Sequence, residues 1–109
     1  MLGFVMKRFA FKMKLKPGMT EEYKRRHDEI WPRLAEVLRA AGVSDYSIFL
    51  DEETHTLFAV QRQADKSTVA ELPKHSVVRE WWDYMAPLME TRPDNEPVSV
   101  ELKEMFHLD

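Results

Sequence analysis

The chain has 109 residues and no cysteine, 44% of its residues are hydrophobic, and its formal net charge is −3 at pH 7. This length and composition fit one folded domain, residues 1–109, with a packed core. The slightly acidic charge argues against a nucleic-acid partner, and the lack of cysteine excludes disulfide and thiolate chemistry. No apolar run approaches the roughly 20 residues of a membrane span, and the charged amino terminus is unlike a signal peptide, so we expect a soluble cytoplasmic protein without a membrane partner.

The first predicted element is a strand over residues 4–16. Apolar side chains occupy alternate positions of this segment, namely Val5, Phe9, Phe11, Met13 and Leu15. Basic residues occupy most of the intervening positions, and this alternation is typical of a strand with one buried face. Pro17 and Gly18 are expected to end the strand in a turn.

A helix is predicted from Thr20 to about Ala41, where Gly42 stops it. Its apolar stripe, with steps of three and four residues, contains Tyr23, His27, Ile30, Trp31, Leu34, Leu38 and Ala41. Pro32 is expected either to kink this helix or to split it and begin a second piece.

A hairpin is predicted next, formed by strands over residues 43–50 and 56–63 around a turn. On the first of these strands, one side carries Tyr46, Ile48 and Leu50. Residues 66–72 are expected to form a short helical turn that ends before Pro73.

Ser76 is expected to cap the second main helix. The apolar residues of this helix are Val77, Val78, Trp81, Trp82, Met85, Leu88 and Met89. Residues 91–97 then form a loop, because they are rich in residues that break regular structure. Residues 98–108 alternate apolar and polar side chains and are predicted to form the last strand.

The predicted order is therefore strand, helix, strand, strand, helix, strand. This order is typical of a ferredoxin-like α+β fold, in which helices cover one face of an antiparallel sheet. The other sheet face also carries aromatic and branched residues. We expect a second copy of the sheet to cover that face, which gives a homodimer.

His27 interrupts the apolar stripe of the first helix, between Tyr23 and Trp31 one turn away on either side. One interpretation is a core histidine satisfied by a single hydrogen bond. The other is a general acid or base in a pocket with aromatic walls, because unperturbed imidazole titrates near neutral pH. Spacing alone does not decide between these two interpretations.

Trp81 and Trp82 are adjacent, so they cannot share one face of a helix. Each is explained either as a large core residue or as part of a stacking wall. Indole faces pack against the C–H face of a sugar ring, and the indole N–H can donate to a hydroxyl. Together with Tyr23 and Tyr46, the two tryptophans form a set that suits a small polyhydroxylated ligand.

The remaining histidines, His55, His75 and His107, have no histidine partner at the spacing of metal ligands on a helix. Without cysteine, the sequence predicts no zinc site. It also has neither a glycine-rich phosphate loop nor the serine elbow of α/β-hydrolases.

Several segments together resemble the L-rhamnose mutarotases. They are EEYKRRHDEIWPRL, YSIFLD, LFA, WWDYM and PDNEPVSVELKEMFHLD, and they cover nearly the whole chain in order. The resemblance implies a dimeric α+β barrel that interconverts the α and β pyranose anomers of L-rhamnose without a cofactor or a metal. It assigns the acid/base role to His27 and sugar contacts to Tyr23, Tyr46, Trp81 and Trp82.

Two departures from the family pattern concern the amino terminus, where Met6 lies nearer the usual start, and residues 64–75. If residues 64–75 line the pocket mouth, the preferred sugar could be L-fucose or another aldose. Two alternatives remain. Dimeric α+β barrels also include cofactor-free monooxygenases and haem-degrading enzymes, in which His27 would ligate haem. A non-catalytic sugar-binding module would need the aromatic walls without an acid/base group.

Overall fold

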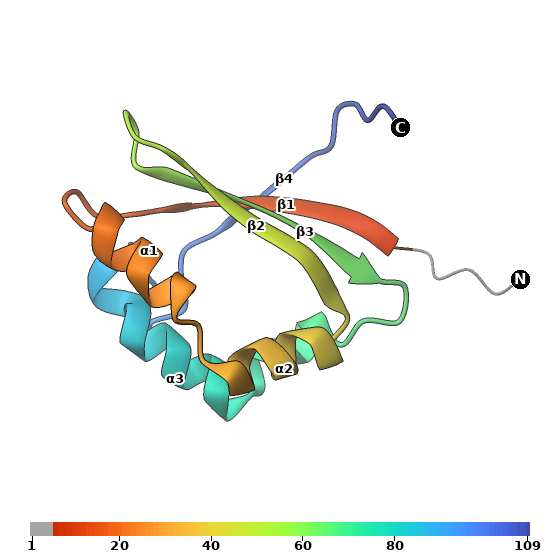
Figure 1. Cartoon of the computed structure of the whole chain (residues 1–109), viewed down its shortest axis with the longest axis horizontal. Coiled ribbons are helices and arrows are strands. Elements are labelled where there is room, and N and C mark those ends of the chain that lie inside the picture. The colour runs from red at the N-terminus through yellow and green to blue at the C-terminus, as the bar shows by residue number, and fades with distance from the viewer. Residues whose placement is uncertain (1–5) are drawn as a thin grey trace, which may run out of the picture.

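The computed structural model describes residues 6–109, in which helices cover one face of a four-stranded sheet (Figure 1). In chain order the elements are β1 (Met6–Lys14), α1 (Thr20–Asp28), α2 (Pro32–Ala40), β2 (Val43–Asp51), β3 (Thr56–Ala64), the 3₁₀ helix η1 (Val69–Lys74), α3 (Ser76–Met85), the 3₁₀ helix η2 (Ala86–Leu88) and β4 (Val100–Leu102). The first two positions of the strand predicted over residues 4–16 lie outside the described residues. Among those described, no helix is both long and apolar enough to cross a bilayer.

The sheet has the strand order β2-β3-β1-β4, and all its neighbouring strands are antiparallel. This confirms the antiparallel α+β fold and the order of elements expected from the sequence. On the inner face, Leu57 of β3 lies between Leu50 of β2 and Met13 of β1. These side chains meet the buried faces of α2 and α3, including Leu34 and Val78, so the core lies between the sheet and the helical layer.

Pro32 splits the first predicted helix in two. Helix α1 ends at Asp28, and Pro32 is the first residue of α2. Trp31 has extended backbone angles, φ −60° and ψ 126°, because the ring of a following proline disfavours the helical conformation. Of the two outcomes expected for Pro32, the split is the one observed. Trp31 therefore does not continue the face of α1 that carries His27.

A bulge interrupts the pairing of β2 with β3. Ser44 pairs with Arg62 and Ser47 pairs with Val60, so Asp45 and Tyr46 together face the single residue between these two partners, which is Gln61. Asp45 takes a positive φ of 48°, a conformation in which aspartate is tolerated better than most residues. Bulges often redirect a side chain next to a functional site.

Three predicted boundaries were wrong. The short helical turn contains Pro73 instead of ending before it, because a 3₁₀ turn over Val69–Lys74 accommodates the ring. His75, not Ser76, caps α3, and its Nδ1 accepts the backbone N–H of Val77 at 3.2 Å. Helix α3 itself ends at Met85, and Leu88 belongs to η2.

The last strand is much shorter than predicted. Pairing with β1 covers only Val100–Leu102, opposite Lys12, Phe11 and Ala10. A strand forms only where its backbone finds a partner, and the residues after Leu102 have none within the described chain. Figure 1 shows this tail leaving the sheet on the side away from the helices.

Candidate functional site

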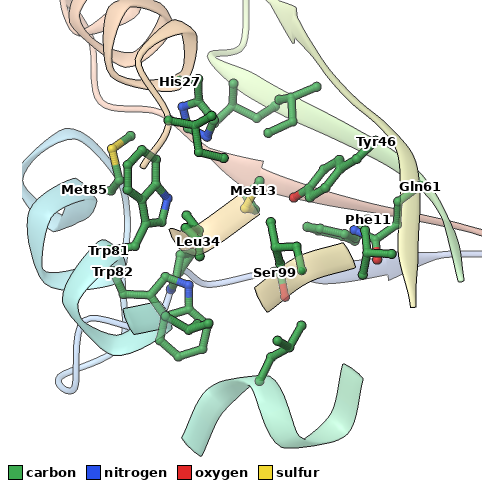
Figure 2. A pocket seen from close by; sticks show the side chains of 18 of the residues that line it. Phe11, Met13, His27, Leu34, Tyr46, Gln61, Trp81, Trp82, Met85 and Ser99 are labelled. Carbon is green, nitrogen blue, oxygen red and sulfur yellow. The ribbon is translucent and has the colours of Figure 1, made fainter. Parts of the chain in front are cut away.

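A cavity of about 1150 Å³ opens between the inner face of the sheet and the helical layer. All five residues singled out from the sequence line it: Tyr23, His27, Tyr46, Trp81 and Trp82. Figure 2 shows His27, Trp81 and Trp82 on the helical side, and Tyr46 on the sheet side. The fold therefore brings together residues that lie as far apart in sequence as positions 23 and 82.

His27 lies on α1 with its ring stacked on that of Tyr23, at 4.3 Å between centroids. The edge of the Trp81 ring meets it at 5.4 Å. Its Nδ1 lies 3.1 Å from the backbone carbonyl oxygen of Tyr23, so Nδ1–H donates to that oxygen. This bond selects the tautomer in which Nε2 carries the lone pair. Among residues 6–109, Nε2 has no hydrogen-bond partner.

Burial lowers the pKa of His27 below its ordinary value of 6.5, because the charged imidazolium would lose its hydration. The carbonyl of Tyr23 and the charge of Asp28 oppose this effect only in part. At neutral pH the ring is therefore a neutral base whose Nε2 can accept a proton.

The two tyrosines favour the protonated form at neutral pH, whereas His27 favours the deprotonated form. Burial raises the pKa of Tyr23 above its ordinary value, and the nearby phenol of Tyr46 raises it further. Desolvation also raises the pKa of Tyr46 to about 12. Although Tyr46 is 38% exposed, its hydroxyl points into the cavity (Figure 2). Both phenols therefore stay protonated at neutral pH and can donate hydrogen bonds.

The adjacent tryptophans of α3 occupy different environments. Trp81 is buried, with Trp31 at 5.0 Å and Tyr84 at 5.7 Å between ring centroids. Trp82 is half-buried, and the guanidinium of Arg79 lies 5.4 Å from its ring. Trp81 is thus both a core residue and part of the cavity wall, whereas Trp82 has more of its surface free for a ligand.

Trp31 is placed differently from the sequence prediction. It was expected on the His27 face of one helix, but it stacks on Tyr84 at 5.4 Å and meets the edge of Trp81. The aromatic partner of His27 opposite Tyr23 is therefore Trp81 and not Trp31.

Arg26, the residue before His27, attaches α1 to α3. Its guanidinium lies 4.1 Å from the centroid of the Tyr84 ring and donates to the backbone carbonyl oxygen of Tyr84. It also donates to Glu22 at 2.6 Å. Arg25 and Arg26 lower the pKa of Glu22 to about 2, so this carboxylate is ionised at neutral pH. Sequence reasoning missed Arg26, because one arginine among several charged residues gives no sign of burial.

The other histidines stand apart from this arrangement. His75 caps α3, and His107 meets the carboxylate of Asp109 in the exposed tail. His55 lies in the β2–β3 turn with its Nδ1 buried and without a partner in the described part of the chain. Within residues 6–109, no three histidine or acidic side chains gather in a way that could hold a metal ion.

The cavity also has polar residues that the sequence prediction did not include. Gln61, Gln63 and Ser99 line it, and Gln61 lies across β2–β3 from the bulge that carries Tyr46. A signal for the two glutamines was present in the sequence. They occupy the same parity of β3 as the buried Leu57 and Ala59, where another apolar residue would be expected.

The arrangement combines a neutral imidazole, two protonated phenols and indole surface around one cavity. Such a site can take a proton from a ligand hydroxyl at one point and donate a hydrogen bond to a ligand oxygen at another. It presents aromatic surface to the apolar side of a ring. This combination suits proton transfer on a small hydroxylated ring compound.

The comparisons with known proteins agree on one family. A family model described as L-rhamnose mutarotase matches residues 8–108. The chain is 58% identical to an L-rhamnose mutarotase of Sinorhizobium fredii over 103 residues, which are 94% of this chain and 99% of that protein. It is 62% identical to one of Mesorhizobium japonicum over 101 residues, 93% of this chain and 96% of that protein.

A crystal structure of an L-rhamnose mutarotase from Formosa agariphila has the same fold, with a TM-score of 0.89. That protein is 48% identical, and the match covers 94% of this chain and 99% of the other. A conserved protein from Methanosarcina mazei, 14% identical with a TM-score of 0.59, shares the fold alone.

Proposed function

Because the chain belongs to the L-rhamnose mutarotase family, we propose that it is an aldose mutarotase that interconverts the α and β pyranose anomers of L-rhamnose. Its cavity is large enough for a monosaccharide, and aromatic residues from α1, β2 and α3 line it. The proposed ligand is therefore a single sugar ring bound between the sheet and the helices.

One observation carries the mechanism. His27 is held in a single tautomer by the carbonyl of Tyr23, and its Nε2 is left for a ligand in a cavity where Tyr23 and Tyr46 remain protonated. The base and the hydrogen-bond donors are thus separate groups with pKa values displaced in opposite directions. Enzymes commonly use two groups with pKa values displaced in this way as general acid and general base at one pH.

In the proposed reaction, Nε2 of His27 accepts the proton of the anomeric hydroxyl. The electron pair of that O–H bond forms the carbonyl at C1, and the bond from C1 to the ring oxygen breaks. The ring oxygen takes up a proton through a hydrogen bond from one of the phenols or from water. Rotation about C1–C2 then exposes the other face of the aldehyde, and the same steps in reverse close the ring. The net reaction changes only the configuration at C1.

Trp81 and Trp82 are proposed to contact the sugar ring, and Tyr23 and Tyr46 to hold its oxygens. No cofactor or metal has a place in these steps, because proton transfer alone opens and closes a hemiacetal.

The oxygenase and haem alternatives rest on shared architecture, which says little about chemistry. A non-catalytic module would have no use for a neutral imidazole that shares a cavity with two protonated phenols. The family match therefore favours the mutarotase over both.

The proposal includes a homodimer in which two sheets face one another and complete an α+β barrel. It is supported by apolar residues that remain exposed on the sheet face away from the helices and in the tail, among them Phe49 and Phe106. A cytoplasmic location is also part of the proposal, since small secreted domains usually depend on disulfides and this chain has no cysteine.

The test of the mechanism is His27→Asn, which keeps a similar shape and some hydrogen bonding but removes the titrating ring. We expect the variant to fold and to bind L-rhamnose while its catalysed anomer exchange, measured by saturation-transfer NMR, falls at least about a hundredfold. His107→Asn, the same change in the exposed tail, is the matched control and should keep the parental rate. Parental exchange in a folded His27→Asn protein would remove this residue from the mechanism.

A further inference from the structure

Gln61 is a buried polar residue on the inner face of β3. It is 5% exposed, and within residues 6–109 only Thr56 is a comparably buried polar residue. The hydroxyl of Thr56 meets Lys14 Nζ at 3.0 Å and the Thr54 hydroxyl at 2.7 Å. Thr56 is thus satisfied by its own strand and its neighbours, whereas Gln61 lines the sugar cavity.

The surroundings of Gln61 leave half of its amide without a partner. The side chain of Gln63, two residues along the same face, donates from Nε2 to Oε1 of Gln61 at 2.9 Å. The Nε2 of Gln61 has no hydrogen-bond partner in the described part of the chain. Its pairing neighbours are Phe9 on β1 and the β2 bulge with Tyr46, and aromatic rings cannot satisfy an amide N–H as an oxygen does.

Gln61 also lies in a suitable place for a ligand. Figure 2 shows Gln61, Tyr46 and Phe11 together on the sheet side of the pocket, across from His27, Trp81 and Trp82. Apart from Gln61 and Gln63, the side chains of β1 and β3 that line this wall are apolar, including Phe11, Met13 and Leu57. Binding sites of this type use a few placed polar groups on an apolar wall to fix the orientation of the ligand.

We propose that Gln61 is a specificity-determining residue whose amide nitrogen donates a hydrogen bond to a sugar hydroxyl at C3 or C4, with Gln63 holding the amide in position. The amide nitrogen faces the cavity with no acceptor in the described part of the chain, and a ligand hydroxyl supplies one. His27 requires the anomeric centre on the helical side of the cavity, so the sheet wall meets the opposite part of the ring. This inference rests on the proposed function for the orientation of the sugar.

A hydrogen bond from Gln61 would affect which sugar the protein prefers to bind. L-Rhamnose and L-fucose differ in the configuration at C2 and C4, so a donor fixed near C4 distinguishes between them. A site built to pair with a hydroxyl rejects an analogue without it more strongly than an apolar wall does. Gln63 acts only through Gln61, and we expect its loss to have a smaller effect.

The experiment compares Gln61→Met, which keeps the length of the side chain but removes the donor, with Gln63→Met and the parent. Each protein is titrated by NMR with L-rhamnose and with its 2-, 3- and 4-deoxy derivatives, and anomer exchange is recorded on the same samples. We expect Gln61→Met to weaken L-rhamnose binding by about tenfold, the loss of one hydrogen bond. Its affinity for the deoxy sugar that lacks the contacted hydroxyl should equal the parental affinity for that sugar.

Gln63→Met should give the same pattern with a smaller change, and both variants should keep a melting temperature near that of the parent. A merely structural role would weaken all four sugars by the same factor, and that result would overturn the proposal, as would unchanged L-rhamnose binding. Measurements on the parent protein distinguish the proposed mutarotase activity from the proposed role of Gln61. A parent that binds L-rhamnose without accelerating exchange would refute the mutarotase activity, while the binding comparison would still decide the role of Gln61.

Discussion

Three contacts determine the protonation state of His27, two from Tyr23 and one from Trp81. The carbonyl of Tyr23 fixes the tautomer from four residues earlier on the same helix. The Tyr23 ring covers one face, and Trp81 from α3 meets the imidazole at 88° between ring planes. Desolvation by these neighbours lowers the pKa below 6.5, which leaves the imidazole neutral and basic at physiological pH.

This shift predicts the pH dependence of exchange. The catalysed rate should be flat through neutral pH and fall on acidification with an apparent pKa below 6.5, since only the neutral ring accepts the anomeric proton. Exchange measured by NMR from pH 4.5 to 8, corrected for the uncatalysed rate at each pH, gives the profile. A midpoint above 6.5 would contradict a buried neutral base.

The same group also links stability to pH, which sets the control for that profile. At pH values between 6.5 and the lower pKa of the folded state, His27 is mostly protonated in the unfolded chain and mostly neutral in the folded protein. The free energy of unfolding therefore has its full value above pH 6.5 and decreases as the pH falls through the folded pKa. Circular dichroism at each pH separates a loss of folded protein from protonation of the proposed catalytic base.

Much of the site could be predicted at the scale of residues, because helical spacing is a local property. Tyr23 and His27 are one turn apart on α1, and their rings stack as the spacing requires. Trp31 could not be placed in this way, since the extended backbone before Pro32 turns it toward α3. Gln61 faces Tyr46 only because β2 has a bulge, and no residue pattern in β2 predicts an irregular register.

At the scale of elements, the kind and order of the helices and strands could be predicted from local patterns, although three local boundaries were wrong. Alternation predicted β1 and the hairpin, and Pro32 was recognised as a break. Alternation also predicted a strand over residues 98–108, but only Val100–Leu102 pairs with β1. Periodicity shows which side chains could share a face, whereas a strand needs a neighbouring backbone, and the sequence does not state where that neighbour comes from.

The attachment of α1 to α3 through Arg26 gives a testable prediction at this scale. Arg26→Met removes a half-buried charge-assisted bond to the Tyr84 carbonyl and a contact with the Tyr84 ring, so we expect a loss of roughly 2 kcal/mol in the free energy of unfolding. Chemical denaturation measures it, and exchange per folded molecule should also fall because α1 carries His27.

The adjacent Arg25 offers a matched control. Its side chain is 53% exposed, and its salt bridges are to Glu22 and Glu29, on and beside its own helix. Arg25→Met should therefore change stability much less than Arg26→Met does, and it should leave exchange unchanged. Equal losses in the two variants would mean that Arg26 does not hold α1 in place.

At the scale of the whole molecule, the sheet face away from the helices carries apolar side chains that remain exposed. Phe49 of β2 pairs with Phe58 of β3, and in the same row Lys12 of β1 pairs with Val100 of β4. Phe49 is 62% exposed, and the tail adds Met105, Phe106 and Leu108, each about 80% exposed. Apolar surface of this extent on one side is typical of an interface, and the proposed twofold partner would also supply backbone for the unpaired tail.

The last prediction tests that interface through Phe49→Glu, which places a charge where the proposed partner sheet would bury it. Because Phe49 is exposed within one chain, the fold should survive, whereas the dimer dissociation constant should rise at least about 30-fold, as for a central interface residue. Analytical ultracentrifugation over a dilution series measures this constant in the parent and in the variant. Ala70→Glu, an equal charge on exposed η1 in the helical layer, should keep the parental dissociation constant. A parent that sediments as a monomer, or a Phe49→Glu variant with the parental dissociation constant, would show that this sheet face is not the dimer interface.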